Sequence, residues 1–471
     1  MKVFLLVVTV LFGNVKLCLF DATMDASDVT WGHAINNKKL LEENLKNDIN
    51  FLEADVSLGD VMGPNPERSV PIMAHPPIVT SDISLQSWIE KVILAETGKG
   101  VKLDFKFIEI VEPSLQILKS HENKLTFPLW LNADIIPGPI NADTKPVDSA
   151  KFLQLCQQYF PAATLSVGWT TKVNFSSQES YTWLHIKEML DALHCAKIKQ
   201  PVTFPIRATF VQRSINQLVW LLGAFPNSTL TVWSSPIDTV NVDSLLKLRS
   251  LLPFSDVYYD IPTQLLKQFN KGKSGIRPPS LPYNFNHYKW IPIGDEEECS
   301  NKTFISSLGA LFPSGNHGLM LNLEPQSELK FEGEITFIHL EAESSLHLLL
   351  CEGKYFPSPL LSTENLFKEL KTCAIVSLAF SNEDVHKYFK LTFGPRNGSL
   401  VISDEKTDQK VLTHNFNYTG NVTVAFISEG GPAVLYNAGN KMVSSSVIPK
   451  LSVINALVVI IFSLMRFWRN I

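Results

Sequence analysis

Acidic and histidine side chains occur in short motifs near the start of the chain. The motifs are Trp31-Gly32-His33, Glu53-Ala54-Asp55, Ala74-His75 and Asp104-Phe105-Lys106. Glu53, Asp55 and Asp104 offer hard carboxylate oxygens, which Mg²⁺ and Ca²⁺ prefer, whereas Zn²⁺ favours more nitrogen or sulfur. His33 and His75 offer a proton donor and a proton acceptor. These residue types predict acid–base chemistry beside one Mg²⁺ or Ca²⁺ ion.

The carboxylates must lie on strands for this site to form. Side chains alternate along a strand, so Glu53 and Asp55 project to the same side of a strand expected at 50–56. Two neighbouring carboxylates repel each other unless a positive charge lies between them, and a divalent cation supplies that charge. Asp104, at the equivalent end of the next expected strand, completes the triad. Lys106 alternates with Asp104 on the same face and can neutralise a phosphate oxygen.

Other polar residues can extend this lining. Asn132 and Asp134 end the fourth expected strand and are candidates for contacting substrate, as are Arg207 and Trp233 further along. Each residue also has an ordinary structural explanation. Asp104 lies between Lys102 and Lys106 and can be half of an internal ion pair. A histidine at a strand end is commonly structural, and packing or surface exposure explains Arg207 and Trp233 better than a site role does.

Strand-like and helix-like segments alternate over residues 28–265. The expected strands are 29–33, 50–56, 100–107, 128–135, 164–170, 202–210, 229–234 and 256–260, and amphipathic segments between them include 37–47, 85–96, 148–159, 181–196, 212–222 and 242–251. Eight strands alternating with helices predict an α/β fold, a (β/α)₈ barrel of the TIM type. The Gly- and Pro-rich segment 57–80 follows the second strand, on the side where such barrels keep their active sites.

A second folded unit is expected, because 471 residues exceed the size at which one hydrophobic core stops growing. Residues 266–282 have the composition of a linker. Beyond it, in 283–436, helical periodicity disappears and short strands are expected at 318–323, 333–341, 346–351, 374–380, 388–393, 399–403, 421–427 and 433–436. This pattern predicts an all-β, sandwich-like C-terminal domain.

Both ends of the chain have the composition of targeting segments. Residues 1–20 resemble a signal peptide, and six glycosylation sequons follow, at Asn174, Asn227, Asn301, Asn397, Asn417 and Asn421. Residues 437–471 have the arrangement of a GPI signal with attachment at Asn437, and the alternative is a single span flanked by Arg466 and Arg469. We therefore expect an extracellular protein, secreted or membrane-anchored. The net charge of −5 gives no reason to expect nucleic acid as a partner.

Cysteine usage fits an oxidising compartment. Of six cysteines, Cys18 leaves with the expected signal peptide, so five remain and at least one is unpaired or pairs with another chain. We expect Cys156 to pair with Cys195 in the first domain, and one further pair among Cys299, Cys351 and Cys373.

The motif-bearing segments resemble the menorin family over residues 28–265. They are residues 29–37 (VTWGHAINN), 51–56 (FLEADV), 71–77 (PIMAHPP), 101–106 (VKLDFK), 128–135 (PLWLNADI) and 165–170 (LSVGWT). That family is in turn similar to glycerophosphodiester phosphodiesterases and related phospholipase-D-type toxins. The resemblance implies a barrel with Glu53, Asp55 and Asp104 as metal ligands, His33 and His75 as the catalytic pair, and Lys106 on a phosphate.

The sequence departs from the diesterases beside both histidines. His33 is followed by Ala34 where they carry arginine, and His75 is followed by Pro76 where they carry aspartate. Two functions therefore stay open. One is a phosphodiesterase acting on a glycerophosphodiester or phospholipid head group. The other is a non-catalytic extracellular ligand that binds cell-surface proteins through the barrel. A glycosidase ranks lower, because Glu53 and Asp55 lie side by side rather than across a sugar.

Overall fold

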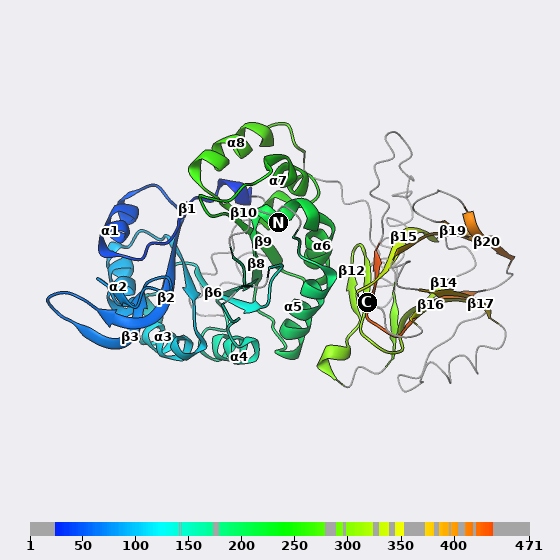
Figure 1. Cartoon of the computed structure of the whole chain (residues 1–471), viewed down its shortest axis with the longest axis horizontal. Helices are drawn as coiled ribbons and strands as arrows, with labels where there is room; N and C mark the ends of the chain where they lie inside the picture. Colours follow the sequence, from blue (N-terminus) through cyan, green and yellow to red (C-terminus); the bar gives the residue numbers. More distant parts are fainter. Residues whose placement is uncertain are drawn as a thin grey trace, which may run out of the picture.

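The computed structural model describes the two folded regions of the chain (Figure 1). The described residues are 24–140, 142, 144–172, 179–277, 289–294, 298–323, 329–338, 344–352, 373–380, 386–394, 397–403, 410–417 and 421–436. The expected signal peptide, the sequon at Asn174, the attachment residue Asn437 and the C-terminal anchor signal lie outside them. Within the described residues, no helix has both the length and the apolar character needed to cross a membrane.

Eight parallel strands form a nearly closed barrel. They are β1 (Trp31–Gly32), β2 (Phe51–Val61), β5 (Gly100–Phe105), β6 (Leu129–Ile136), β7 (Thr164–Trp169), β8 (Val202–Arg207), β9 (Ser228–Trp233) and β10 (Val257–Asp260), hydrogen-bonded in this order. Each overlaps one of the segments expected to be a strand, and β2 continues to Val61, beyond the expected segment 50–56. The predicted (β/α)₈ barrel is therefore confirmed.

Helices alternate with these strands. They are α1 (Lys38–Lys46), α2 (Leu85–Ala95), α3 (Ile108–Ser120), α4 (Ser149–Tyr159), α5 (Trp183–Cys195), α6 (Val211–Ala224), α7 (Val242–Arg249) and α8 (Thr263–Lys273). Side-chain N-caps explain several starts, because Ser84 and Asp148 each accept a hydrogen bond from a backbone N–H three residues on. The sequence pattern did not reveal α3, which contains Pro113 and begins without a side-chain cap.

Helix α8 extends into the segment that was expected to be a linker. Residues 266–273, expected to belong to the linker, continue α8 instead. Phe269 of this helix is fully buried, and its ring centroid lies 4.2 Å from that of Tyr259 in β10. The apolar contact explains why this segment packs on the barrel despite its polar composition.

Aromatic side chains close the amino-terminal end of the barrel. Trp31, Phe51, Trp130 and Tyr258 stand near the starts of β1, β2, β6 and β10, with ring centroids 4.8–6.3 Å apart. Phe51 shares its face of β2 with Glu53 and Asp55, because side chains alternate along a strand. The aromatic layer thus lies below the acidic residues, and the site is left at the carboxyl-terminal end.

The segment 57–80 is largely a β-hairpin rather than an irregular loop. Strand β2 extends to Val61 and pairs antiparallel with β3 (Glu67–Met73), while the short β4 (Thr80–Ser81) pairs parallel with β2. In Figure 1 the hairpin projects from the side of the barrel away from the C-terminal sheets. It therefore extends the site end of β2 beyond the other strands.

The C-terminal region consists of two antiparallel sheets, as expected. One contains β11 (Ile291–Ile293), β14 (His317–Leu323), β21 (Val422–Glu429), β16 (Ser345–Glu352) and β17 (Ala374–Ala379). The other contains β12 (Phe304–Ser306), β13 (Gly309–Phe312), β22 (Ala433–Tyr436), β15 (Leu329–Phe337), β18 (His386–Gly394), β19 (Asn397–Ser403) and β20 (Lys410–Asn417). Buried residues of both sheets, such as Leu348 and Phe312, share one apolar core. Strands β11, β12, β13 and β20 were not expected from the sequence.

The observed disulfides correct one of the expected pairings. Cys195 pairs with Cys299, not with Cys156, and Cys351 pairs with Cys373 as one of the options for the second pair. Cys156 is a buried free thiol on α4. The Cys156 thiol lies in the core, where burial raises its pKa. Cys195 instead lies at the end of α5, in contact with the short helix η6 (Cys299–Asn301), which carries its disulfide partner. The two disulfides indicate an oxidising compartment.

The barrel and the C-terminal sheets are in direct contact. The Ser306 hydroxyl donates a hydrogen bond to the backbone oxygen of Trp220 in α6, at 3.0 Å. The rings of Trp183 in α5 and Tyr436 in β22 lie 5.8 Å apart. Phe304 and Val434 belong to the same buried apolar cluster as the barrel core. The interface therefore joins α5 and α6 to the β12–β13–β22 edge (Figure 1).

Candidate functional site

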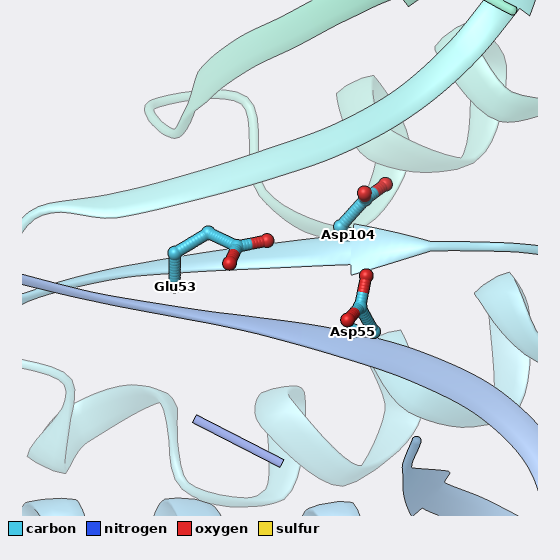
Figure 2. Close-up of side chains that lie close together, drawn as sticks. All are labelled: Glu53, Asp55 and Asp104. Carbon is cyan, nitrogen blue, oxygen red and sulfur yellow. The ribbon is translucent and has the colours of Figure 1, made fainter. Parts of the chain in front are cut away.

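Three carboxylates meet at the carboxyl-terminal end of the barrel. Glu53 and Asp55 come from β2, and Asp104 comes from β5 directly opposite Asp55 in the sheet register. One oxygen of each lies within 4.8 Å of the others. Figure 2 shows the three side chains close together, Glu53 and Asp55 on one strand and Asp104 on the next. The expected triad is therefore assembled, and it can hold one metal ion.

Backbone and amide groups hold these carboxylates in place. The Ala34 N–H donates to Glu53 Oε2 at 2.8 Å. Asn36 donates through Nδ2 to Asp55 Oδ2 at 2.7 Å and accepts the Asp55 N–H at 2.9 Å. Both donors come from the segment after β1, where Ala34 adopts a φ of +53°, a conformation uncommon for an alanine. This turn therefore supplies the backbone and amide donors that hold Glu53 and Asp55.

Lys106 lies between two of the carboxylates. Its ammonium is 2.7 Å from Asp55 Oδ1 and 2.5 Å from Asp104 Oδ2. Burial favours the neutral amine, but the two aspartates outweigh it and raise the pKa of Lys106. Burial likewise works to raise the pKa of Asp55, yet Lys106 outweighs it and the pKa is lowered. Lys106 and Asp55 therefore both stay charged at neutral pH.

Glu53 is less well compensated than Asp55. It is only 3% exposed, and burial together with the negative charge of Asp55 raises its pKa, although the charge of His33 opposes the rise. A carboxylate in this position gains from any additional positive charge. The electrostatics of Glu53 therefore fit a cation at the triad.

His33 is held by two carboxylates at the end of β1. Its Nδ1 lies 2.9 Å from Asp260 Oδ2 and 3.4 Å from Glu53 Oε2. The charge of Glu53 raises the pKa of His33 against the opposing effect of burial, and Asp260 raises it further, to about 10. The ring therefore carries a proton on both nitrogens in this geometry, as a proton donor requires.

Asp260 is a site residue that the sequence analysis missed. It is buried at the end of β10, the last barrel strand, and reaches His33 across the gap between β10 and β1. The sequence contained a signal for Asp260, because a closed barrel brings its last strand beside its first. An acidic residue at the end of the eighth expected strand, 256–260, is therefore a candidate partner for His33 at the end of the first.

His75 lies at the mouth of the site. The N–H of the preceding Ala74 donates to the backbone oxygen of Asp55 at 3.1 Å, which ties this loop to β2. The exposed ring places Nδ1 2.6 Å from the backbone oxygen of Pro76. Because a carbonyl oxygen only accepts, Nδ1 carries a proton, which leaves Nε2 as the ring nitrogen that can accept one. His75 is thus arranged as a proton acceptor.

Asn132 and Asp134 lie inside the barrel on β6. Asn132 donates to Asp104 Oδ1 at 2.7 Å and accepts from the Ser166 hydroxyl at 2.5 Å, so both ends of its amide orient the site. Burial and the nearby Asp104 raise the pKa of Asp134 to about 7. Gly168 leaves the space for this carboxyl, because a Cβ there would lie 2.6 Å from Asp134 Oδ1. Substrate contact by either residue stays a prediction.

Three further residues that the sequence analysis mentioned lie outside the triad. They are Lys102, Arg207 and Trp233. Lys102 is buried on the inward-facing row of β5 that also carries Asp104 and Lys106. Sequence reasoning treated it only as an ion-pair partner. Arg207 instead forms a two-pronged ion pair with Asp238, at 2.7 and 3.0 Å, and stacks 5.0 Å from the Trp233 ring. These contacts fit the packing explanation for Arg207 and Trp233.

Comparison with known proteins places the barrel in a family context. Residues 25–266 match the family model described as the menorin N-terminal domain. Over 242 residues the chain is 42% identical to "Protein FAM151B" of Homo sapiens, covering 50% of this chain and 83% of that protein.

Solved structures give only weak likenesses. A legume lectin-like domain from Entamoeba histolytica has a TM-score of 0.22 at 9% identity, covering 35% of this chain and 92% of that chain. The exoplasmic/lumenal domain of VIP36 in its Ca²⁺/Man2-bound form has a TM-score of 0.20 at 11% identity, covering 33% and 83%. Likenesses of this size support no conclusion about fold or ligand.

Proposed function

The chain belongs to the menorin family, and from this premise we propose that its barrel is a phosphodiesterase that depends on one divalent cation and acts on a glycerophosphodiester or phospholipid head group. The observation that carries the proposal is the assembled acidic triad, with His33 in contact with it and the loop that carries His75 attached to β2 beside it. Glu53, Asp55 and Asp104 lie within 4.8 Å of one another. His33 contacts Glu53, and the His75 loop is bonded to Asp55.

The donor set fits Mg²⁺ or Ca²⁺. Three carboxylates supply oxygen ligands, and the raised pKa of buried Glu53 indicates that its charge is incompletely balanced. When bound, such an ion would neutralise the phosphate and polarise its P–O bonds. No nitrogen or sulfur ligand belongs to the triad, which argues against Zn²⁺.

The two histidines have complementary roles in this proposal. His75 presents Nε2 as the acceptor or nucleophile, because its Nδ1 donates to the Pro76 carbonyl. His33 is protonated and gives its proton to the leaving oxygen. Asp260 is a positioning residue that accepts the His33 Nδ1–H at 2.9 Å and leaves Nε2–H directed away from it.

Lys106 would act on the substrate once the cation is bound. Its ammonium now contacts the two aspartates that the cation would also bind. A dication repels the ammonium and reduces its attraction to Asp55 and Asp104. Lys106 would then turn toward the open end of the barrel, where it can contact a phosphate oxygen.

One observation favours the alternative function, a non-catalytic extracellular ligand. Lys106 already balances Asp55 and Asp104, so part of the charge in the triad is compensated without a cation. In that case the polar network would stabilise the barrel, and loops at its rim would bind a cell-surface protein. This alternative predicts that the triad binds no divalent cation at millimolar concentration.

Calorimetry with Mg²⁺ and with Ca²⁺ on the full chain and on Asp55→Asn separates the two functions. Saturable binding by the wild type that Asp55→Asn loses would support the cation site. It would also justify a screen of phosphodiester substrates, in which His33→Ala should abolish turnover while circular dichroism stays unchanged. A folded wild-type chain that binds neither ion would contradict the phosphodiesterase and favour the ligand.

A further inference from the structure

Four large apolar side chains are exposed together beside the candidate site. Leu58, Met62, Ile78 and Val79 are between 47% and 65% exposed, and we call them the hairpin patch. Single exposed apolar residues are common, but a contiguous group on a soluble domain commonly marks an interaction surface. The hairpin patch is therefore a candidate interaction surface.

Backbone hydrogen bonds hold the two halves of the hairpin patch together. Leu58 lies on β2 and Met62 directly follows it, while Ile78 and Val79 come from the loop before β4. The Asp60 N–H donates to the Val79 backbone oxygen at 3.0 Å, and the Met62 N–H donates to that of Ser81 at 2.8 Å. The two segments that carry the four exposed side chains are thus held side by side.

The hairpin patch is connected to the candidate site at both ends. Its β2 half continues the strand that carries Glu53 and Asp55. Its loop half begins one turn after His75, because the Ile78 N–H donates to the His75 backbone oxygen at 3.1 Å. A ligand on the hairpin patch would therefore lie next to the proposed proton acceptor.

Two more exposed apolar residues follow barrel strands at the same end. Phe107 comes directly after Lys106, beyond β5, and Ile237 lies in the loop after β9. By contrast, Leu94 near the carboxyl end of α2 is exposed at the opposite end of the barrel, because the helices return antiparallel to the strands. Exposed apolar side chains thus accompany the polar site on several of its loops.

We propose that the hairpin patch enters the surface of a phospholipid bilayer and presents the site to membrane phosphodiester head groups. The inference rests on the proposed function and narrows its substrate class to lipids. A bilayer offers an apolar layer directly beneath its phosphodiesters, which matches an apolar surface beside the acidic and histidine residues. The charged neighbours Asp60 and Arg68 pair with each other at 2.5 Å, so this part of the hairpin has no excess positive charge. A zwitterionic phosphatidylcholine surface fits it better than an anionic one.

Sedimentation with phosphatidylcholine vesicles tests the proposal on residues 24–436, which contain both folded regions and leave out the expected C-terminal anchor that would itself bind vesicles. A chelator of divalent cations is present, because the vesicle lipids are themselves phosphodiesters and would be substrates under the proposed function. The wild type should sediment with the vesicles, and Ile78→Ser/Val79→Ser should bind at least about tenfold more weakly, because two apolar side chains no longer leave water. Leu94→Ser, which removes an 81% exposed apolar side chain at the other end of the barrel, is the matched control and should bind like the wild type.

Two results would overturn the proposal: no sedimentation of the wild type, or equal binding by wild type and double variant. Equal loss in Leu94→Ser and in the double variant would also overturn it, because binding would then be nonspecific. Binding to a purified protein but not to vesicles would assign the hairpin patch to a protein partner instead.

Failure of the proposed function has a different signature. Asp55→Asn should still sediment with vesicles, because the hairpin patch is intact. Vesicle binding by a wild type that hydrolyses no phosphodiester would reject catalysis and leave the membrane surface supported. Hydrolysis of a soluble glycerophosphodiester without vesicle binding would reject the membrane surface and leave catalysis supported.

Discussion

At the residue scale, each positive group of the site is shared between two acids, and under the proposed function the Lys106 ammonium would compete with the cation for two of the three carboxylates. Lys106 contacts Asp55 and Asp104, two of the three carboxylates that a cation would bind. His33 is shared between Glu53 and Asp260 in a similar way. Each positive group therefore lies between two acids, and removing one group changes the affinity of the site for the others.

Lys106→Met should bind Mg²⁺ roughly tenfold more tightly than the wild type, because a positive charge a few ångströms from the cation is removed. Under the proposed function its turnover should fall about a hundredfold, because the phosphate contact is lost. Calorimetry and turnover measured on the same preparation check both effects. The control is Lys119→Met. It removes an exposed lysine of the outer helix α3 that pairs with Glu122, just beyond that helix. Unchanged or weaker Mg²⁺ binding by Lys106→Met would contradict the competition.

Asp260→Asn and Asp260→Ala should differ in their effect on His33. The amide oxygen of asparagine can still accept the His33 Nδ1–H, so Asp260→Asn should keep the orientation of the ring. Asp260→Ala removes the oxygen that accepts this hydrogen bond. We expect turnover about tenfold lower for asparagine and lower still for alanine. Nitrogen-detected NMR of the His33 ring checks the hydrogen bond directly. Identical spectra for the wild type and the alanine variant would show that Asp260 does not position His33.

At the element scale, ion pairs join the segment before the first barrel strand to the last two helices of the barrel. The short helix η1 (Ala26–Asp28) precedes β1, and Lys273 at the end of α8 donates to Asp28 at 2.8 Å. Asp25 at the start of η1 pairs with Arg249 at the end of α7. Because β1 and β10 are not joined by a strand pairing in the described residues, these side-chain contacts help to close the barrel.

Asp25→Asn should destabilise the barrel in a pH-dependent way. Burial works to raise the pKa of Asp25, but hydrogen bonds from Arg249 and Ser27 outweigh it and lower the pKa from 3.8 to about 2. A depressed pKa stabilises the fold above pH 3.8, and this contribution is lost as the pH falls toward 2. Urea unfolding should show a loss of about 1 kcal/mol at pH 7, after allowance for solvent screening. The difference should shrink as the pH falls below 4; a constant difference would contradict the assigned ion pair.

At the scale of the whole molecule, the barrel and the C-terminal sheets share an interface and a covalent link. The disulfide between Cys195 and Cys299 joins α5 to the segment before β12. In the same interface, Gly223 of α6 leaves space for the end of β12, because a Cβ there would lie 2.4 Å from the Ser306 hydroxyl oxygen. The β2–β3 hairpin lies on the side of the barrel away from these sheets (Figure 1). A bilayer could therefore reach the hairpin patch without obstruction by them.

Replacing Cys195 and Cys299 together by serine should lower the free energy of unfolding by about 2–4 kcal/mol, because the bond closes a long loop in the unfolded chain. The two cysteines are separated by 104 residues. Differential scanning calorimetry checks the loss, and Cys156→Ser is the control for replacing a cysteine outside a disulfide. Mg²⁺ binding should be unchanged, because neither cysteine contacts the triad. No shift in melting temperature would contradict the stabilising role.

The sequence by itself was sufficient for features that depend on local periodicity. Alternation along β2 predicted that Glu53 and Asp55 share a face, and the strand count predicted the barrel that brings Asp104 beside them. It was not sufficient for α3, where Pro113 contradicts the helical pattern, or for α8, whose burial rests largely on Phe269.

Tertiary structure alone decided the partners that are distant in the chain. Asp260 reaches His33 from 227 residues away, and Cys195 pairs with Cys299 rather than with Cys156 of the neighbouring helix. Lys106 bridges Asp55 of β2 and Asp104 of β5. The physical reason is common to all three. Periodicity shows which face of an element a side chain occupies, but only the packing of whole elements determines which faces meet.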